Sequence, residues 1–222
     1  PELANAFPWL DVLGVDSPYD YDPVWRRCLE LGFSPTFHSS GRGRAFGLRN
    51  SASSFVYNHI GHFAAASEAV CKALFLGGVT LRFPALKFGF LEGGVGWACQ
   101  LLCDVLGHWE KRRPEALADV DPGNLDEEAL LGLARRFARD DFVAVMEDRA
   151  RRAAPVTRTD APPEGIDEFE GCGFETAGDL VRQFVEGFYF GCEADDPMNA
   201  LAFQRAYLPQ GVQLSTLFGS DI

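Results

Sequence analysis

The sequence predicts an α/β fold built from parallel β/α units, arranged as an incomplete barrel. Short apolar runs alternate with stretches of helical periodicity, which is typical of parallel strands joined by crossover helices. Three of the apolar runs also lead directly into a side chain that can bind a metal or move a proton: His38, Glu92 and Asp221. Catalytic groups of α/β barrels lie at the carboxyl ends of the strands. We therefore expect these three side chains to meet in one site.

Five strands are expected, at residues 10–15, 35–37, 86–91, 188–192 and 212–218. Helices are expected between them, at residues 22–31, 54–76, 96–111, 175–185 and 197–207. Five strands are too few to close the usual eight-stranded barrel, which needs about 250 residues. The chain is therefore interpreted as a single incomplete barrel domain over residues 1–222, a fragment of a larger enzyme that is inactive by itself.

The alternation of strands and helices is interrupted over residues 112–171, which we interpret as a helical and loop insertion within the barrel. Residues 125–152 have the pattern of one charged, amphipathic helix, with Leu130, Leu133 and Phe137 in its apolar stripe. Residues 153–167 are rich in proline and polar residues, which predicts a linker.

The composition excludes several classes of partner. The 222 residues carry 20 Lys and Arg against 32 Asp and Glu, a formal net charge of −12, which repels nucleic acid. No apolar run approaches the roughly 18 residues that a membrane-spanning helix needs. The six cysteines are sparse and irregularly spaced, as reduced core thiols are, so a cytoplasmic location is expected.

The candidate site combines an imidazole with carboxylates. This donor set suits a divalent metal, most of all Zn²⁺, with Fe²⁺ or Mn²⁺ as alternatives. We assign His38 and Asp221 as metal ligands, and Asp221 and Glu92 as catalytic acid–base groups. Each residue also has a structural interpretation, as a loop histidine or as a carboxylate that caps a helix. Their common position at strand ends favours the functional interpretation.

Further residues are candidates for binding substrate. Arg42, Arg44 and Arg49 lie in the loop after the second strand, where a guanidinium group could bind a substrate carboxylate. A solvated basic loop explains these arginines equally well. Tyr19 and Tyr21 follow the first strand and are expected at the same mouth.

Two histidines lie three residues apart, His59 and His62, and therefore on one face of the expected helix. A buried or interface pair is favoured over a metal-binding pair at this spacing. Glu193 follows the fourth strand, where helix capping explains it as well as catalysis does.

Three segments resemble the amidohydrolase-related family of metal-dependent hydrolases and decarboxylases: YDPVWRRCLELGFSPTFHSS, FLGGVTLRFPALKFGFLEGGVGW and the terminal LFGSD. The resemblance covers most of the chain outside residues 112–171. It implies a distorted TIM barrel of which this chain is the C-terminal portion, strands four to eight. His38 would then be the fifth-strand metal ligand and Asp221 the eighth-strand ligand.

The chain departs from the family pattern in two respects. It contains no His-x-His, so the two first-strand ligands are missing from this chain, and its sixth strand ends in Glu92 where a histidine is common. The resemblance therefore supports the family better than the reaction.

The expected function is that of a metal-dependent lyase or hydrolase, decarboxylase-like or cleaving C–N or C–O bonds, on a small carboxylated or cyclic organic substrate. The alternative is a non-catalytic barrel relative that serves as a binding or assembly protein. Whether copies of the chain form a homo-oligomer is left open.

Overall fold

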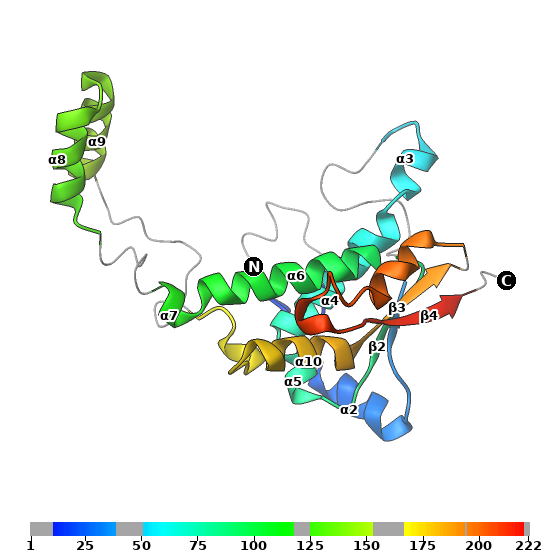
Figure 1. Cartoon of the computed structure of the whole chain (residues 1–222). Helices are drawn as coiled ribbons and strands as arrows, with labels where there is room; N and C mark the ends of the chain where they lie inside the picture. Colours follow the sequence, from blue (N-terminus) through cyan, green and yellow to red (C-terminus); the bar gives the residue numbers. More distant parts are fainter. Residues whose placement is uncertain (1–10, 39–50, 118–124, 153–166, 194, 220–222) are drawn as a thin grey trace. The chain divides into compact units, whose positions relative to one another are not determined.

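The computed structural model describes residues 11–38, 51–117, 125–152, 167–193 and 195–219. The chain divides into two compact units: Pro1–Glu110 together with Phe169–Ile222, and Lys111–Glu168. The first unit contains a β-sheet with helices, and the second contains a helical hairpin (Figure 1). We describe each unit by itself.

The sheet of the first unit has four parallel strands: β1 (Thr36–Phe37), β2 (Phe88–Phe90), β3 (Phe188–Glu193) and β4 (Ser215–Gly219). Their spatial order is the sequence order, β1-β2-β3-β4. Because every pair is parallel, the carboxyl ends of all four strands lie along one edge of the sheet. We call this edge the carboxyl edge.

The prediction of a partial barrel with five strands is wrong, because the described residues form an open four-stranded sheet with β1 and β4 at its edges. The expected strand at residues 10–15 is also wrong, since residues 11–12 belong to no strand and residues 13–16 form bends. The Asp11 carboxylate accepts hydrogen bonds from the Leu13 N–H and the Ser17 hydroxyl, both at 2.8 Å. Leu13 has φ 70°, which no strand allows. Local side-chain bonds have here displaced a strand.

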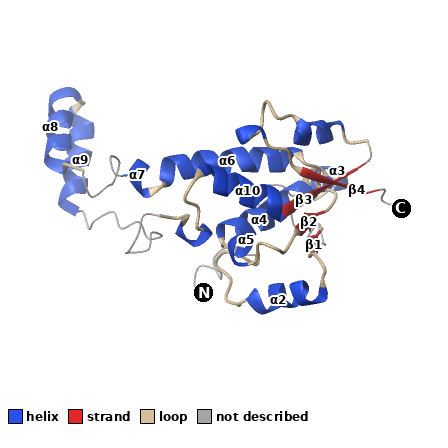
Figure 2. Cartoon of the chain, turned by 60° about the horizontal axis from the view of Figure 1, so that its bottom comes forward, coloured by secondary structure: helices blue, strands red, loops and turns tan. Residues whose placement is uncertain are grey.

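One face of the sheet is built from phenylalanine. Side chains alternate along each strand, so Phe88 and Phe90 on β2 share a face with Phe188 and Phe190 on β3, and all four are fully buried. The rings of Phe90 and Phe190 stack with centroids 6.1 Å apart. Three helices contribute further rings to this cluster: Phe75, Trp97 and Phe184. This face is the hydrophobic core of the unit, and the helices lie beside it (Figure 2).

The helices of the first unit are α2 (Asp22–Leu31), α3 (Phe55–His59), α4 (His62–Leu76), α5 (Val79–Arg82), α6 (Gly96–Arg112) and α10 (Ala177–Gly187). The described residues of this unit also form short 3₁₀ helices at Glu170–Cys172, Pro197–Phe203 and Pro209–Gly211.

Two of the expected helices differ from the structure. The helix expected at residues 54–76 is divided into α3 and α4, because Gly61 between them takes φ 74° and acts as the N-cap of α4. The helix expected at residues 197–207 is the 3₁₀ helix Pro197–Phe203. The expected helix at residues 22–31 is confirmed, and it ends at Gly32 with φ 70°.

The second unit contains α7 (Pro114–Leu117), α8 (Glu127–Phe137) and α9 (Asp140–Arg152). The single helix expected at residues 125–152 is therefore two helices. Ala138 leaves the helical region with ψ 165°, and the acidic pair Asp140 and Asp141 then begins α9, as negative side chains favour a helix N-terminus. Most of the expected linker, residues 153–166, lies outside the described residues.

Within the described ranges, every helix is too short or too polar to cross a membrane.

Candidate functional site

Two of the three predicted site residues meet at the carboxyl edge. His38 directly follows β1, and Glu92 comes two residues after the end of β2. The Nε2 atom of His38 lies 3.0 Å from the Oε1 atom of Glu92. The side chains are 48% and 34% exposed, so both the pair and any ligand that reaches it are accessible to solvent. The third residue, Asp221, lies outside the described residues.

The backbone at Glu92 has a left-handed conformation, with φ 60°. Such a conformation costs a residue with a long side chain about 1–3 kcal/mol and is concentrated at functional sites. The next residues fix this turn to β3, since the Gly94 N–H donates to the Gly191 carbonyl over 3.1 Å. Gly94 has φ 69°, a left-handed conformation that favours glycine, and a Cβ there would also lie 2.9 Å from Asp196 Oδ2. The strained turn orients the Glu92 carboxylate toward His38.

An aromatic ring also packs on the histidine. Phe63 on α4 meets the His38 ring edge-on, with centroids 5.1 Å apart and an interplanar angle of 87°. The same ring contacts His59 at 5.1 Å and His62 at 6.1 Å. His59 ends α3 and His62 begins α4, so they do not share one helix as expected, and His62 is buried. Phe63 was missed because an apolar helical residue carries no functional signal.

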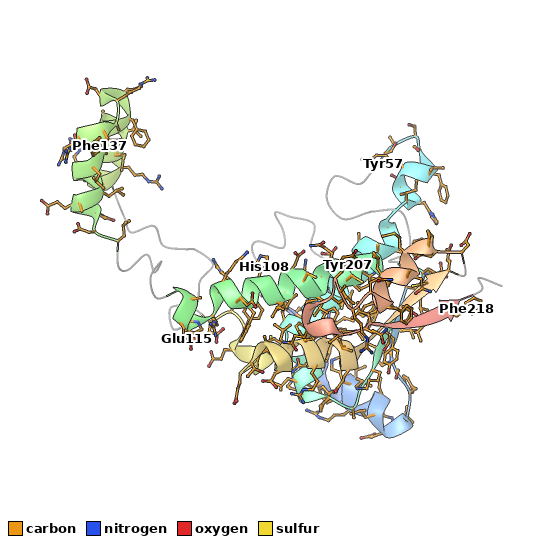
Figure 3. All side chains as sticks on the ribbon, viewed as in Figure 1. Tyr57, His108, Glu115, Phe137, Tyr207 and Phe218 are labelled. Atoms are coloured by element: carbon orange, nitrogen blue, oxygen red, sulfur yellow. The ribbon has the colours of Figure 1, made fainter. Side chains whose placement is uncertain are left out.

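A small pocket opens beside Glu92, between the ends of β2, β3 and β4. Its volume is about 110 Å³, and it is lined by Leu91, Glu92, Gly191, Cys192, Glu193, Leu217, Phe218 and Gly219. Phe218 is at the outer end of β4 (Figure 3). Typical ligand pockets measure about 300–1,000 Å³, so this one suits a small group or a few waters.

The cysteine in the pocket is not a nucleophile at neutral pH. Burial raises the pKa of Cys192 to about 11, and the nearby Asp196 and Cys99 act in the same direction. The thiolate, which is the reactive form, is therefore scarce. The chemistry of this edge is left to the imidazole and the carboxylates.

The His38–Glu92 pair fits a metal in part. Two ligands bound at about 2.0–2.1 Å to a tetrahedral zinc ion lie about 3.3 Å apart, close to the observed separation of Nε2 and Oε1. A protein site needs at least one further donor. In the described part of the chain, no three histidine, cysteine or acidic side chains come together as a metal-binding group. The described residues thus supply two donors of an incomplete set.

The two predicted tyrosines belong to a separate cluster. Tyr21 donates a hydrogen bond to Asp11 Oδ2 over 3.0 Å, and its ring lies 6.3 Å from those of Tyr19 and Trp25. Trp25 packs on Phe88 at the amino end of β2. Arg42, Arg44 and Arg49 lie outside the described residues. The structure therefore joins the two tyrosines to Asp11 and Trp25.

Comparisons with protein-family models, with curated proteins and with solved structures find no match to this chain. The resemblance to amidohydrolase-related enzymes therefore rests on the residues alone. The fold and the site together define an α/β protein with an imidazole–carboxylate pair at the carboxyl edge of a parallel sheet.

Proposed function

We propose that this protein is a metal-dependent lyase or hydrolase that acts on a small carboxylated or cyclic organic substrate at the carboxyl edge. The observation that carries the proposal is the 3.0 Å contact between His38 Nε2 and Glu92 Oε1. The two residues are distant in sequence and lie at the ends of neighbouring parallel strands, where α/β proteins bind ligands and hold catalytic groups.

The pair supports acid–base chemistry. When Nε2 carries the proton and donates it to the Glu92 carboxylate, Nδ1 is the basic nitrogen of the ring. The carboxylate fixes this tautomer and stabilises the imidazolium that forms when Nδ1 accepts a proton. The edge-on contact with Phe63 restricts the rotation of the ring further.

This arrangement suits two related reactions. In hydrolysis, the pair takes a proton from the attacking water and returns it to the leaving nitrogen or oxygen. In decarboxylation, the C–C bond to the carboxylate breaks, CO₂ leaves with no electrons from that bond, and the pair delivers a proton to the carbon that keeps them. Arg42, Arg44 or Arg49 would bind the substrate carboxylate.

The proposed enzyme uses a divalent metal, which would be zinc, with iron or manganese as alternatives. His38 and Asp221 would hold it. A ring nitrogen that binds a metal cannot also accept a proton, so Glu92 alone, in place of the His38–Glu92 pair, would then be the acid–base group. When bound, such an ion polarises a carbonyl or lowers the pKa of water.

Metal content and turnover of four proteins test the proposal: the wild type, His38→Ala, Glu92→Gln and the control His108→Ala. His108 is an exposed residue of α6 whose Nδ1 lies 2.7 Å from the Asp104 carbonyl oxygen. His38→Ala is expected to lower metal per chain and activity together. Glu92→Gln is expected to lower activity about 10²-fold or more. The control should match the wild type. If His38→Ala keeps both metal and activity, the proposal fails.

The products distinguish the two reactions. Panels of small aromatic acids, and of esters, amides and lactones, would be incubated with the metal-loaded protein. Release of CO₂ identifies a lyase, whereas release of alcohol or amine without CO₂ identifies a hydrolase.

A second candidate is a binding or assembly protein without turnover, favoured by the small pocket with apolar walls at Leu91, Leu217 and Phe218. Saturable binding of a small ligand, weakened by Phe218→Ala, together with no metal and no turnover, would support this candidate.

A further inference from the structure

We infer that the α8–α9 hairpin is a self-association surface, on which the hairpin of a second copy packs to form an antiparallel four-helix bundle. This inference is independent of the reaction proposed above. It begins with an exposed apolar stripe on each helix: Leu130, Leu133 and Phe137 on α8, and Phe142 and Val145 on α9. These five side chains are between 40% and 72% exposed. Phe137 is the most exposed of them (Figure 3).

The stripes are distinct from the residues that hold the hairpin together. Leu131 and Ala134 on α8, and Val143 and Met146 on α9, are the more buried apolar residues of the two helices. At about 100° per residue, each stripe is rotated by roughly 110° from these inward-facing positions. A helix in a four-helix bundle needs two such faces, because it contacts two neighbours.

The two stripes lie on the same side of the hairpin. On both helices the rotation from the inward-facing residues to the stripe has the same sense along the chain. Since α8 and α9 run in opposite directions, equal rotations carry both stripes to one side. The other side carries the ion pair between Arg135 and Glu147, at 2.9 Å. One side of the hairpin therefore carries the apolar stripes, followed on α9 by Arg149 near its end, and the other side carries the ion pair.

The hairpin has little core of its own. Among the described side chains of α8 and α9, only Ala134 is buried. Helices of 11 and 13 residues are marginal without packing on an apolar face. A second hairpin on the exposed side would bury the stripes of both copies.

Charge favours a copy of the hairpin as the occupant. The first turn of α8 carries Glu127 and Glu128, and its last turn carries Arg135 and Arg136. Helix α9 repeats the pattern, with Asp140 and Asp141 at its start and Arg149 and Arg151 near its end. Antiparallel neighbours therefore place acidic turns beside basic turns at every contact. The surface is self-complementary, as a two-fold dimer requires.

The size of the surface limits the affinity. The 13 residues of α9 span about 20 Å, and two helices side by side are about 20 Å wide, which gives roughly 400 Å² per copy. The total of about 800 Å² is below the roughly 1,200–2,000 Å² of stable specific interfaces, so a weak, reversible dimer with a dissociation constant in the micromolar range is expected.

Light scattering after size exclusion tests the inference on the full chain at about 100 µM, well above the expected constant. The wild type should have twice the monomer mass. Phe137→Glu should halve that mass, and Phe33→Glu should not. Phe33 is a matched control, because it is an apolar residue of the first unit that is 52% exposed.

Circular dichroism would show that both variants fold. Leu133→Cys in a Cys103→Ser background provides a second test, because an oxidised dimer should form with it and not with the control Phe33→Cys in the same background. A monomeric wild type overturns the inference. This holds whether Phe137→Glu leaves the stability of the chain unchanged or lowers it, since a lower stability would mean that Phe137 makes a contact within one chain. A dimer that Phe137→Glu leaves intact overturns it as well.

Discussion

The two units differ in how far the apolar faces of their helices are buried. In the first unit, helices α4, α6 and α10 lay aromatic side chains against a sheet whose four phenylalanines in β2 and β3 are fully buried. In the second unit, α8 packs on α9, and Ala134 is the one buried side chain among the described residues of these two helices. Both units contain amphipathic helices with caps. The difference is the presence of a second layer.

The comparison shows that an amphipathic helix must pack its apolar face on another element, but that the helix sequence does not tell which element this is. Helix α10 satisfies that need with β3 of its own unit, where Phe184 meets Phe188 at 5.2 Å. The hairpin leaves its stripe exposed. Four experiments can break or sharpen this comparison, beginning with the largest expected effect.

The first experiment truncates the sheet core. Phe188→Ala removes a fully buried ring that contacts Phe75, Phe90 and Phe184. It should lower the free energy of unfolding by about 3–5 kcal/mol, measured by urea denaturation. Phe137→Ala on the hairpin, measured at a concentration low enough to keep the chain monomeric, should change it by less than about 0.5 kcal/mol. Similar losses for both would contradict the contrast between the units.

The second experiment is hydrogen exchange. Backbone amides of α8 and α9 should exchange at least about tenfold faster than those of β3 in dilute solution, because little apolar surface protects them. At high concentration the protection of α8 and α9 should rise while that of β3 stays constant. Equal protection of the two units in dilute solution would show that the hairpin is covered within one chain.

The third experiment compares two helix caps. At the start of α10, the Thr176 side chain accepts a hydrogen bond from the Asp179 N–H, and the Asp179 carboxylate accepts one from the Thr176 N–H. At the start of α8, the Asp126 side chain accepts a hydrogen bond from the Ala129 N–H. Thr176→Ala should lower the free energy of unfolding of the first unit by about 1 kcal/mol. Asp126→Ala should leave the free energy of unfolding of the first unit unchanged. The Thr176 hydrogen bond is also the main cause of the lowered pKa of Asp179, so the same variant should raise that pKa in an NMR titration.

The fourth experiment titrates the loop that replaces the expected first strand. Burial raises the pKa of Asp11, but hydrogen bonds from Leu13, Ser17 and Tyr21 outweigh it and hold this pKa below its usual value of 3.8. A lowered pKa stabilises the fold above the unfolded value, and this stabilisation is lost as pH falls through the folded value. NMR signals of Tyr21 should therefore shift only below about pH 4. Asp11→Asn should abolish this transition, and a transition that persists would assign it elsewhere.

Much of the first unit could be predicted from sequence because its signals are local. Proline after Asp22 and glycine at position 32 delimit α2, and short apolar runs with turn signals marked the positions of β2, β3 and β4. The barrel was wrong because closure depends on strand pairing at the sheet edges, which no single segment encodes. The prediction of a first strand at residues 10–15 was wrong because the hydrogen bonds to the Asp11 side chain compete with the extended backbone of a strand.

The site shows the same limit. The positions of His38 and Glu92 at adjacent strand ends could be predicted, and their 3.0 Å contact follows from parallel pairing of β1 with β2. The role of Phe63 could not, because it depends on how α4 packs. The division of residues 125–152 into two helices was missed because periodicity continues across the turn at Ala138.

The left-handed residue between β2 and α6 has a consequence for engineering. Glycine adopts φ 60° without a side-chain penalty, so Glu92→Gly should relieve the turn and gain up to about 1 kcal/mol of stability, apart from the entropy it adds to the unfolded chain. If the same replacement abolishes activity, the glutamate at position 92 lowers the stability of the fold because the reaction requires its carboxylate. Leu13, Asp16 and Gln210 also have positive φ, so glycine should stabilise the chain at these positions without a loss of activity. A loss confined to position 92 would then identify the carboxylate that the reaction uses.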